Sequence, residues 1–170
     1  MLFPTHLLVA GWIGWLSGRP RVRERLPGTP TLSVGWLVVG ATLPDAVDKP
    51  LGALGVVDVY HSVGHSALLA PLAVAVAARH RRGLAAAVGW GSHLALDTLH
   101  IVVNGRAENA VSLLWPVLEQ PEPLGIPPGD FAAFYVGTPS FYLEAVIWTA
   151  AVLVGLRSRF GVGADRRTDG

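Results

Sequence analysis

The chain has 170 residues, of which 51% are hydrophobic and only 15% are charged, and its formal net charge is +1. A soluble domain usually has about a quarter of its residues charged, so this composition indicates a protein that faces lipid as well as its own core. The small net charge, without a stripe of basic and aromatic side chains, predicts no nucleic-acid partner. Because the chain has no cysteine, a disulfide framework and a thiolate metal site are excluded.

Five apolar segments follow one another along the chain, and we predict that each crosses the membrane as a helix. They cover residues 2–16, 31–43, 56–78, 83–103 and 141–156. The second should end at the Leu43-Pro44-Asp45 sequence, and Pro71 should kink the third. The sequence therefore predicts an all-α, polytopic bundle of about five transmembrane helices. Residues 1–160 would form this single domain, and residues 161–170 a charged, disordered tail.

The segments between these spans predict the orientation in the cell membrane. Residues 18–29 contain four arginines, residues 79–82 contain three, and the C-terminal tail is also basic. Since basic loops stay in the cytoplasm, we place the N-terminus outside and the C-terminus inside. Residues 104–140, rich in proline and glycine, are then a long irregular extracytoplasmic loop, with a short helix at residues 110–118.

The fourth span carries polar side chains that a purely lipid-facing helix would lack. His93, Asp97 and His100 are spaced i, i+4 and i+7, so a helix projects all three from one face. A carboxylate at membrane depth costs about 2.5–3.5 kcal/mol, so it is usually paired and faces inward. Imidazole and carboxylate groups bind divalent metals. This face therefore predicts either a metal site or a polar stripe that hydrogen-bonds neighbouring helices.

The predicted topology gathers other residues of metal-binding type in the outer half of the bilayer or just beyond it. They are His6, Asp45, Asp48, His61, His65, His93, Asp97 and His100. Spacing i, i+4 would put His61 and His65 on one helical face. Taken singly, each residue has a simpler interpretation, such as an interfacial histidine or a helix-ending aspartate. Scattered polar residues have no reason to segregate, so we predict a site for one or two divalent ions, with zinc favoured over manganese or iron.

Several short motifs occur in order along the chain: Thr5-His6, Leu43-Pro44-Asp45 with Asp48, His65-Ser66, Ser92-His93 with Asp97, and Leu114-Trp115-Pro116. This series resembles the YdjM-like membrane-bound metal-dependent hydrolases, also labelled LexA-binding inner-membrane-associated hydrolases, whose pattern is LPDxDH, HRGxTHS and SHxxxD. The resemblance covers residues 5–116. It implies ligand roles for Asp45, Asp48, His65, His93 and Asp97, with His6 and His61 as contributors.

This chain also departs from the family's pattern at two places. Lys49 occupies the position of the histidine in LPDxDH. The segment HSVGHS is one residue shorter than HRGxTHS and lacks its arginine, which weakens the argument for His61 as a ligand and for phosphate recognition. The LexA label implies a cytoplasmic partner, for which the sequence offers no support.

A hydrolase is the function that these features favour. A divalent ion would lower the pKa of a bound water from about 15.7 towards about 7 and polarise a phosphoryl or acyl oxygen. Asp45, Asp48 and Asp97 are the candidate catalytic carboxylates, one of which could act as general base. A site opening at headgroup level would most easily meet a membrane lipid or a lipid-linked phosphate. Glu144 has no assigned role.

Two alternatives stay open: a non-enzymatic metal-binding or transport protein, and a scaffold with a structural metal. A transporter needs a polar route through both leaflets, whereas residues 73–78 and 84–89 are apolar. This favours the enzyme. A structural site would have all its coordination positions filled by protein, whereas a catalytic site keeps one for water.

Overall fold

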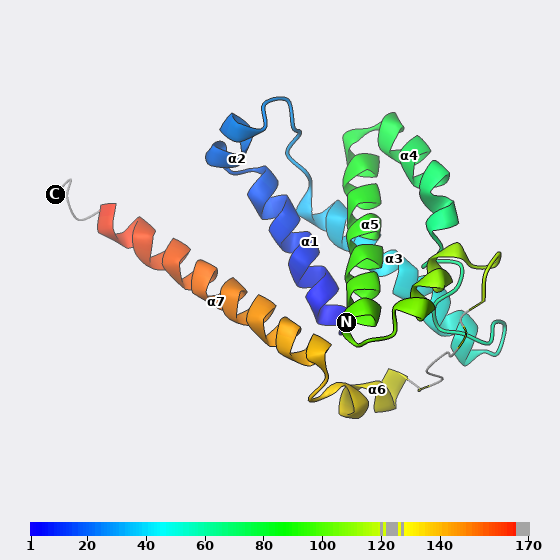
Figure 1. Cartoon of the computed structure of the whole chain (residues 1–170). Coiled ribbons are helices and arrows are strands. Elements are labelled where there is room, and N and C mark those ends of the chain that lie inside the picture. The colour runs from blue at the N-terminus through cyan, green and yellow to red at the C-terminus, as the bar shows by residue number, and fades with distance from the viewer. Residues whose placement is uncertain (120, 122–125, 127, 166–170) are drawn as a thin grey trace.

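The computed structural model describes residues 1–119, 121, 126 and 128–165, and this part of the chain is helical, without strands (Figure 1). The α-helices are α1 (Phe3–Ser17), α2 (Pro20–Arg25), α3 (Val34–Ala53), α4 (Ala70–Arg79), α5 (Arg81–Val103), α6 (Pro128–Tyr135) and α7 (Pro139–Asp165). Two 3-10 helices, η1 (Ala67–Leu69) and η2 (Ala107–Leu114), lie between them. The predicted all-α class is therefore confirmed.

Helices α3 and α5 form the centre of the molecule, with α1 packed against α3 and α4 against α5 (Figure 1). Glycines let α3 and α5 approach closely. A Cβ atom at Gly40 would collide with the carbonyl of Ala86, and one at Gly89 with the carbonyl of Leu37. Small residues at helix contacts are typical of membrane bundles, in which close backbone packing takes the place of the hydrophobic effect.

The two ends of the bundle differ in charge. Helix α2 and the turn between α4 and α5 lie at one end, whereas the N-terminus and the last turns of α5 lie at the other (Figure 1). The first end carries the arginines of residues 19–25 and 79–82. The second end carries the buried histidines and aspartates described below. The predicted segregation along the chain is thus present in space, while the orientation in a membrane stays a prediction.

Helix α3 is longer than predicted because Pro44 does not end it. The helix continues through Pro44 and Pro50 to Ala53, so that Asp45 and Asp48 lie on a helix and not in a loop. Proline removes one helical hydrogen bond, but membrane helices tolerate it where neighbouring groups pack around the freed backbone. Pro44 is fully buried, and the backbone of Gly64 packs closely against it.

The prediction of a helical span over residues 56–78 is wrong in its first half. Residues 54–66, which we call the histidine loop, form turns and bends, and regular helix begins only at Ala67. His61 and His65 therefore do not share a helical face. Pro71 does not kink a helix either. It lies in the first turn of α4, where a backbone N–H has no acceptor within the helix, so proline removes no hydrogen bond there.

Other boundaries differ from the sequence expectation in smaller ways. Residues 18–29 include helix α2, and the expected short helix at 110–118 is the 3-10 helix η2, which begins and ends earlier. Helix α7 continues through residues 161–165, where a tail without regular structure was expected. Residues 166–170 of that predicted tail lie outside the described part of the chain.

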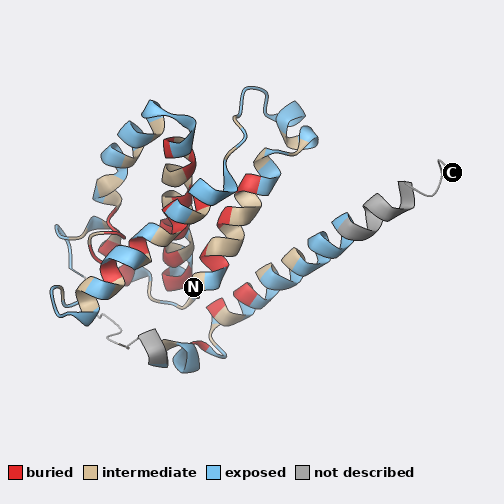
Figure 2. Cartoon of the chain, turned by 180° about the vertical axis from the view of Figure 1, so that it is seen from behind, coloured by how far each residue is buried: buried red, intermediate tan, exposed pale blue. Residues whose placement is uncertain are grey.

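The five-span bundle is not confirmed. Among the described residues, only α7, over Pro139–Ser158, is long and apolar enough to cross a membrane, and Ala67–Arg79 is a shorter apolar helix. Helix α1 has 15 residues, fewer than the about 20 that a bilayer needs. Helices α3 and α5 carry several charged side chains. Most side chains of the apolar segment Pro139–Ser158 of α7 are exposed (Figure 2), which is the pattern expected of a lipid-facing helix.

Candidate metal centre

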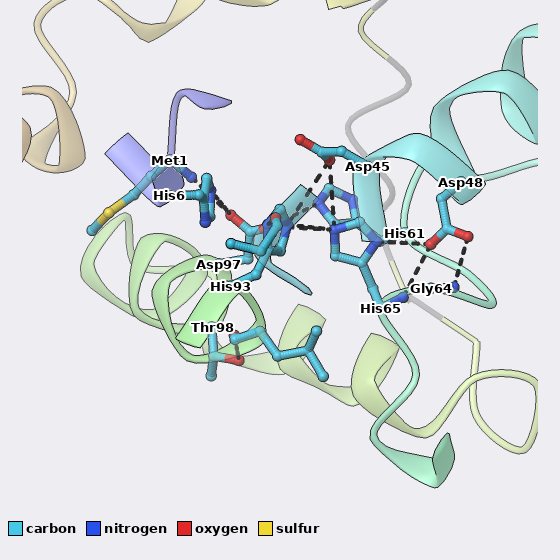
Figure 3. Close-up of polar contacts among 12 residues, drawn as sticks. Met1, His6, Asp45, Asp48, His61, Gly64, His65, His93, Asp97 and Thr98 are labelled. Carbon is cyan, nitrogen blue, oxygen red and sulfur yellow. Dashed lines mark hydrogen bonds and ion pairs between the residues drawn. The ribbon is translucent and has the colours of Figure 1, made fainter. Parts of the chain in front are cut away.

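Asp97, on the inward face of α5, lies at the centre of a group of histidines (Figure 3). Its Oδ2 atom is 3.1 Å from Nε2 of His93, 3.3 Å from Nε2 of His65 and 3.7 Å from Nε2 of His61. Its Oδ1 atom is 3.2 Å from Nε2 of His6. The sequence places these residues on three separate segments, and Asp97 joins all three.

Two further contacts complete the surroundings of this aspartate. The amino group of Met1 is 3.0 Å from Oδ1 of Asp97. The ring of His6 stacks on that of His93, with centroids 3.9 Å apart. All of these side chains except His61 are almost fully buried. The first turn of α1 therefore closes one side of the centre.

The donor atoms are spaced as a small metal ion requires. Nε2 of His65 and Nε2 of His93 are 3.1 Å apart, and the Oδ2 atom of Asp97 lies 3.3 and 3.1 Å from them. A tetrahedral ion with bonds of about 2.0–2.1 Å has ligand atoms about 3.3–3.4 Å apart. Oδ1 of Asp45 lies 3.8 and 3.9 Å from the same two nitrogens. The residues present therefore fit a first-row divalent ion such as zinc.

Three overlapping groups of side chains offer ligand atoms close enough to share an ion. They are His6 with His93 and Asp97, Asp45 with His65 and His93, and His61 with His65 and Asp97. We call these six residues the His/Asp cluster. All six were candidate ligands from the sequence, and the structure brings them together from α1, α3, α5 and the histidine loop. Their number is sufficient for one ion or two.

Second hydrogen bonds fix the orientation of two of the imidazole rings. Nδ1–H of His65 donates to Oδ2 of Asp48 over 2.7 Å, and Nδ1–H of His93 donates to the carbonyl of Ala41 over 2.7 Å. Each bond turns Nε2 towards the centre of the cluster. Metal-binding histidines are almost always oriented in this way, by a carboxylate or a backbone carbonyl.

Asp48 has a different position from the other predicted ligands. It belongs to none of the three groups found in the described part of the chain. Its two oxygens accept backbone N–H groups of Ser62, Gly64 and His65 at 2.7, 2.8 and 3.1 Å, besides the His65 ring. This geometry favours a carboxylate that organises the histidine loop, and a ligand role for Asp48 stays a prediction.

The charge of His65 follows from these neighbours. Burial alone would lower the pKa of this loop histidine, but its hydrogen bonds to Asp48 and Asp97 outweigh burial and raise the pKa to about 9. The ring is therefore protonated at neutral pH when no ion is bound. A metal ion that takes Nε2 must displace this proton.

A cavity of about 300 Å³ opens beside the His/Asp cluster. Asp45, His61 and Asp97 form part of its wall, and Leu2, Phe3, Ile101 and Phe131 contribute apolar surface. Two basic side chains, Lys49 and Arg106, line it as well. The cluster is thus accessible from a space whose walls are partly apolar and partly charged, with both signs of charge present.

Two further polar residues, Glu144 and His100, contact or line this wall and have no assigned ligand role. Oε1 of the buried Glu144, on α7, accepts the backbone N–H of Leu2 at 2.6 Å. His100 lines the cavity one turn after Asp97, with its ring packed against Tyr135 and its Nδ1 3.3 Å from Nδ2 of Asn104. His100 belongs to none of the three ligand groups in the described part of the chain.

Sequence reasoning missed the groups that are part of the backbone. The amino group of Met1, the carbonyl of Ala41 and the N–H groups of the histidine loop have no signature in side-chain type. One weak signal existed. Ser66 and Trp115 belong to two of the ordered motifs, and the Ser66 hydroxyl donates to the Trp115 carbonyl over 2.6 Å. Pairing such motifs would have placed the end of the histidine loop.

Fold and site together define an all-helical protein with a buried His/Asp cluster of the kind that holds divalent metals. The chain belongs to the YdjM inner membrane protein family, whose sequence profile matches residues 1–162. The match confirms the resemblance seen in the motifs and supports a membrane location. No curated protein and no solved structure matches the chain.

Proposed function

We propose that this protein is a membrane-embedded, metal-dependent hydrolase that cleaves a phospholipid or a lipid-linked phosphate ester. The observation that carries the proposal is the position of the His/Asp cluster in the wall of a cavity whose other walls are largely apolar. A purely structural site would be expected to lie away from such an opening. Here Asp45, His61 and Asp97 border the space that a substrate could enter.

The ion would be held by residues of the cluster: His6, Asp45, His61, His65, His93 and Asp97. When bound, it would supply a water of lowered pKa and a charge that polarises the ester oxygen. Asp48 and the Ala41 carbonyl keep His65 and His93 in the orientation that exposes Nε2. Zinc suits this nitrogen-rich set best, with manganese and iron as alternatives.

We assign the proton transfer to Asp45. Its Oδ1 atom lies farther from the Nε2 atoms of His65 and His93 than Oδ2 of Asp97 does, and Asp45 lines the cavity. Such a carboxylate can accept the proton of an attacking water when the water lies within about 2.6–3.2 Å of it. Asp97, which is enclosed by histidines, is better placed to balance the charge of the ion.

The lipid substrate is inferred from the apolar walls and the membrane location. A lipid standing in the bilayer could present its phosphate to the cavity while its acyl chains stay among apolar surfaces. We further propose that α1, α3, α4 and α5 cross the membrane with α7, with the arginine-rich end in the cytoplasm and the cluster in the outer half. The charge difference between the two ends of the bundle supports this orientation.

The test is hydrolysis of a panel of membrane lipids by purified, zinc-loaded protein. We expect turnover of at least one phosphate-containing lipid, loss of turnover with chelator, and poor activity on short water-soluble analogues. Asp45→Ala and His65→Ala should each abolish turnover. Protein that leaves every lipid class intact, yet binds zinc reversibly, would instead be a non-enzymatic metal-binding protein.

A further inference from the structure

We propose that Lys49 is the anion-binding residue of this site. Its ammonium group would hold a phosphoryl oxygen beside the His/Asp cluster, so that the protein selects phosphate esters over uncharged carboxylic esters. This inference rests on the proposed hydrolase function and narrows it, because the metal chemistry alone would serve either kind of ester.

The position of Lys49 supports this role. Its Nζ atom donates to Oδ2 of Asp45 over 2.6 Å, one helical turn earlier on α3. The other oxygen of Asp45, Oδ1, lies near His65 and His93. The two oxygens thus have different partners, and the bond from Lys49 to Oδ2 would leave Oδ1 facing an ion and its bound water. The ammonium group of Lys49 and the divalent ion would then both border the cavity beside Asp45.

The side chain of Lys49 has room to bind more than Asp45. It is 41% exposed, while that of Asp45 is 12% exposed, and Lys49 lines the cavity. An ammonium group has three N–H donors, of which the bond to Asp45 uses one. The centroid of the Phe3 ring lies 5.6 Å from the ammonium group. An oxyanion in the cavity can accept from a remaining N–H donor.

Lys49 is also the only lysine in the chain. The 13 basic residues counted as lysine or arginine include this one lysine, and all the others are arginines. The arginines of residues 19–25 and 79–82 lie at the opposite end of the bundle from the cluster. Lysine binds phosphate as a compact point charge, without the bidentate geometry of arginine.

A second positive side chain strengthens the field in the cavity. Arg106, just after α5, lines the same space as Lys49. The wall also holds three carboxylates, Asp45, Asp58 and Asp97, two of which would be balanced by a divalent ion. A bound ion would thus add positive charge beside Lys49, which favours an anionic substrate.

The direct test measures binding of inorganic phosphate to zinc-loaded protein by titration calorimetry, with zinc content determined in parallel. We expect Lys49→Gln to weaken phosphate binding at least about tenfold, as loss of a charged hydrogen bond of about 1.4 kcal/mol or more implies. Lys49→Arg should retain part of the affinity. Arg81→Gln, which removes the same charge at the opposite end of the bundle, should bind phosphate normally. Equal affinity of Lys49→Gln and unchanged protein, at equal zinc content, would overturn the proposal.

A second measurement does not depend on a variant. Because the chain has one lysine, acetylation of Lys49 by acetic anhydride can be followed by peptide mass spectrometry. Phosphate should protect this amine in zinc-loaded unchanged protein. If Lys49→Gln loses its zinc, this protection decides the question, and an unprotected Lys49 refutes the proposal.

Competition then separates the two sources of a phosphoryl group. Dioleoyl phosphatidate in detergent should displace inorganic phosphate if the site takes a lipid headgroup, whereas dioleoylglycerol, with the same acyl chains, should not. Displacement by dioleoylglycerol would contradict selection by charge. Phosphate binding that depends on Lys49, in protein that hydrolyses no lipid, would leave the anion site standing and reject the hydrolase. Lipid hydrolysis with phosphate binding independent of Lys49 would support the hydrolase and reject Lys49 as the anion-binding residue.

Discussion

Replacing Asp48 by alanine should test whether this residue organises the site or binds the ion. Asp48 is fully buried and accepts three backbone N–H groups of the histidine loop together with the ring of His65. A buried donor left without a partner costs about 1–3 kcal/mol, so three of them cost about 3–9 kcal/mol if the loop stays in place. This is comparable to the whole stability of a typical domain, about 5–15 kcal/mol. The loop should therefore open instead.

Opening of the loop would withdraw His61 and His65 from the cluster while every ligand side chain remains in the sequence. We expect zinc affinity to fall by about 10–100-fold, the range found for residues that orient metal ligands. Competition with a chromophoric chelator measures this change, and thermal unfolding in detergent measures the accompanying loss of stability. Asp58→Ala is the matched control, because Asp58 lies in the same loop and lines the cavity without belonging to the cluster.

The asparagine variant separates the two roles. Asp48→Asn keeps one acceptor oxygen, so the loop should remain partly anchored and zinc affinity should fall less than in Asp48→Ala. If Asp48 were itself a ligand, as the family resemblance implies, Asp48→Asn should lose zinc as completely as Asp97→Asn. Zinc binding of Asp48→Ala at the affinity of the unchanged protein would refute the argument from the loop.

Three further predictions follow from other parts of the structure. Asp97→Asn keeps the size of the side chain but removes the charge at the centre of the cluster, so the zinc content of purified protein should fall strongly; full zinc content would remove Asp97 from the site. In intact cells, cysteine at Arg81 should resist an impermeant thiol reagent, and cysteine at the exposed Val117 should react. The reverse labelling would mean that the protein has the opposite orientation in the membrane. Gly89→Ala should lower the free energy of unfolding by about 1–3 kcal/mol, because its Cβ meets the α3 backbone. Gly91→Ala, with no atom within 4 Å of the new Cβ, should be neutral or stabilising by about 0.5–1 kcal/mol, and equal losses at both positions would contradict the close packing of α3 and α5.

The parts of the site that follow helical periodicity could be predicted from the sequence. His93 and Asp97 are one turn apart on a long apolar helix, so their common face follows from the pattern alone. The same reasoning failed for His61 and His65, although their spacing is identical. Their segment is held as a loop by the carboxylate of Asp48, 14 to 17 residues earlier in the chain. No local pattern contains that contact.

The end of α3 was missed for a related reason. Proline is a strong local signal for the end of a helix, so the sequence predicted an end at Pro44. In the structure the helix continues through Pro44 to Ala53. The packing of the histidine loop against Pro44 is a tertiary contact. The continuous helix carries Asp45, Asp48 and Lys49 together. An error about a single helix end thus changed the expected form of the whole acidic motif from a loop to a helical face.

The bond between Glu144 and the backbone of Leu2 has a consequence for biosynthesis. These residues are separated by 142 positions, and a second bond, from the Trp148 indole to the Thr5 hydroxyl, runs beside it over 3.0 Å. The chain is synthesised from its N-terminus. The bonds from the first turn of α1 to Glu144 and Trp148 can therefore form only after α7 has been made. Thr5 directly precedes His6, which closes the cluster. A nascent chain interrupted before α7 would lack both bonds, so the first turn of α1, which carries His6, would be held beside the cluster only by its contacts with α3 and α5.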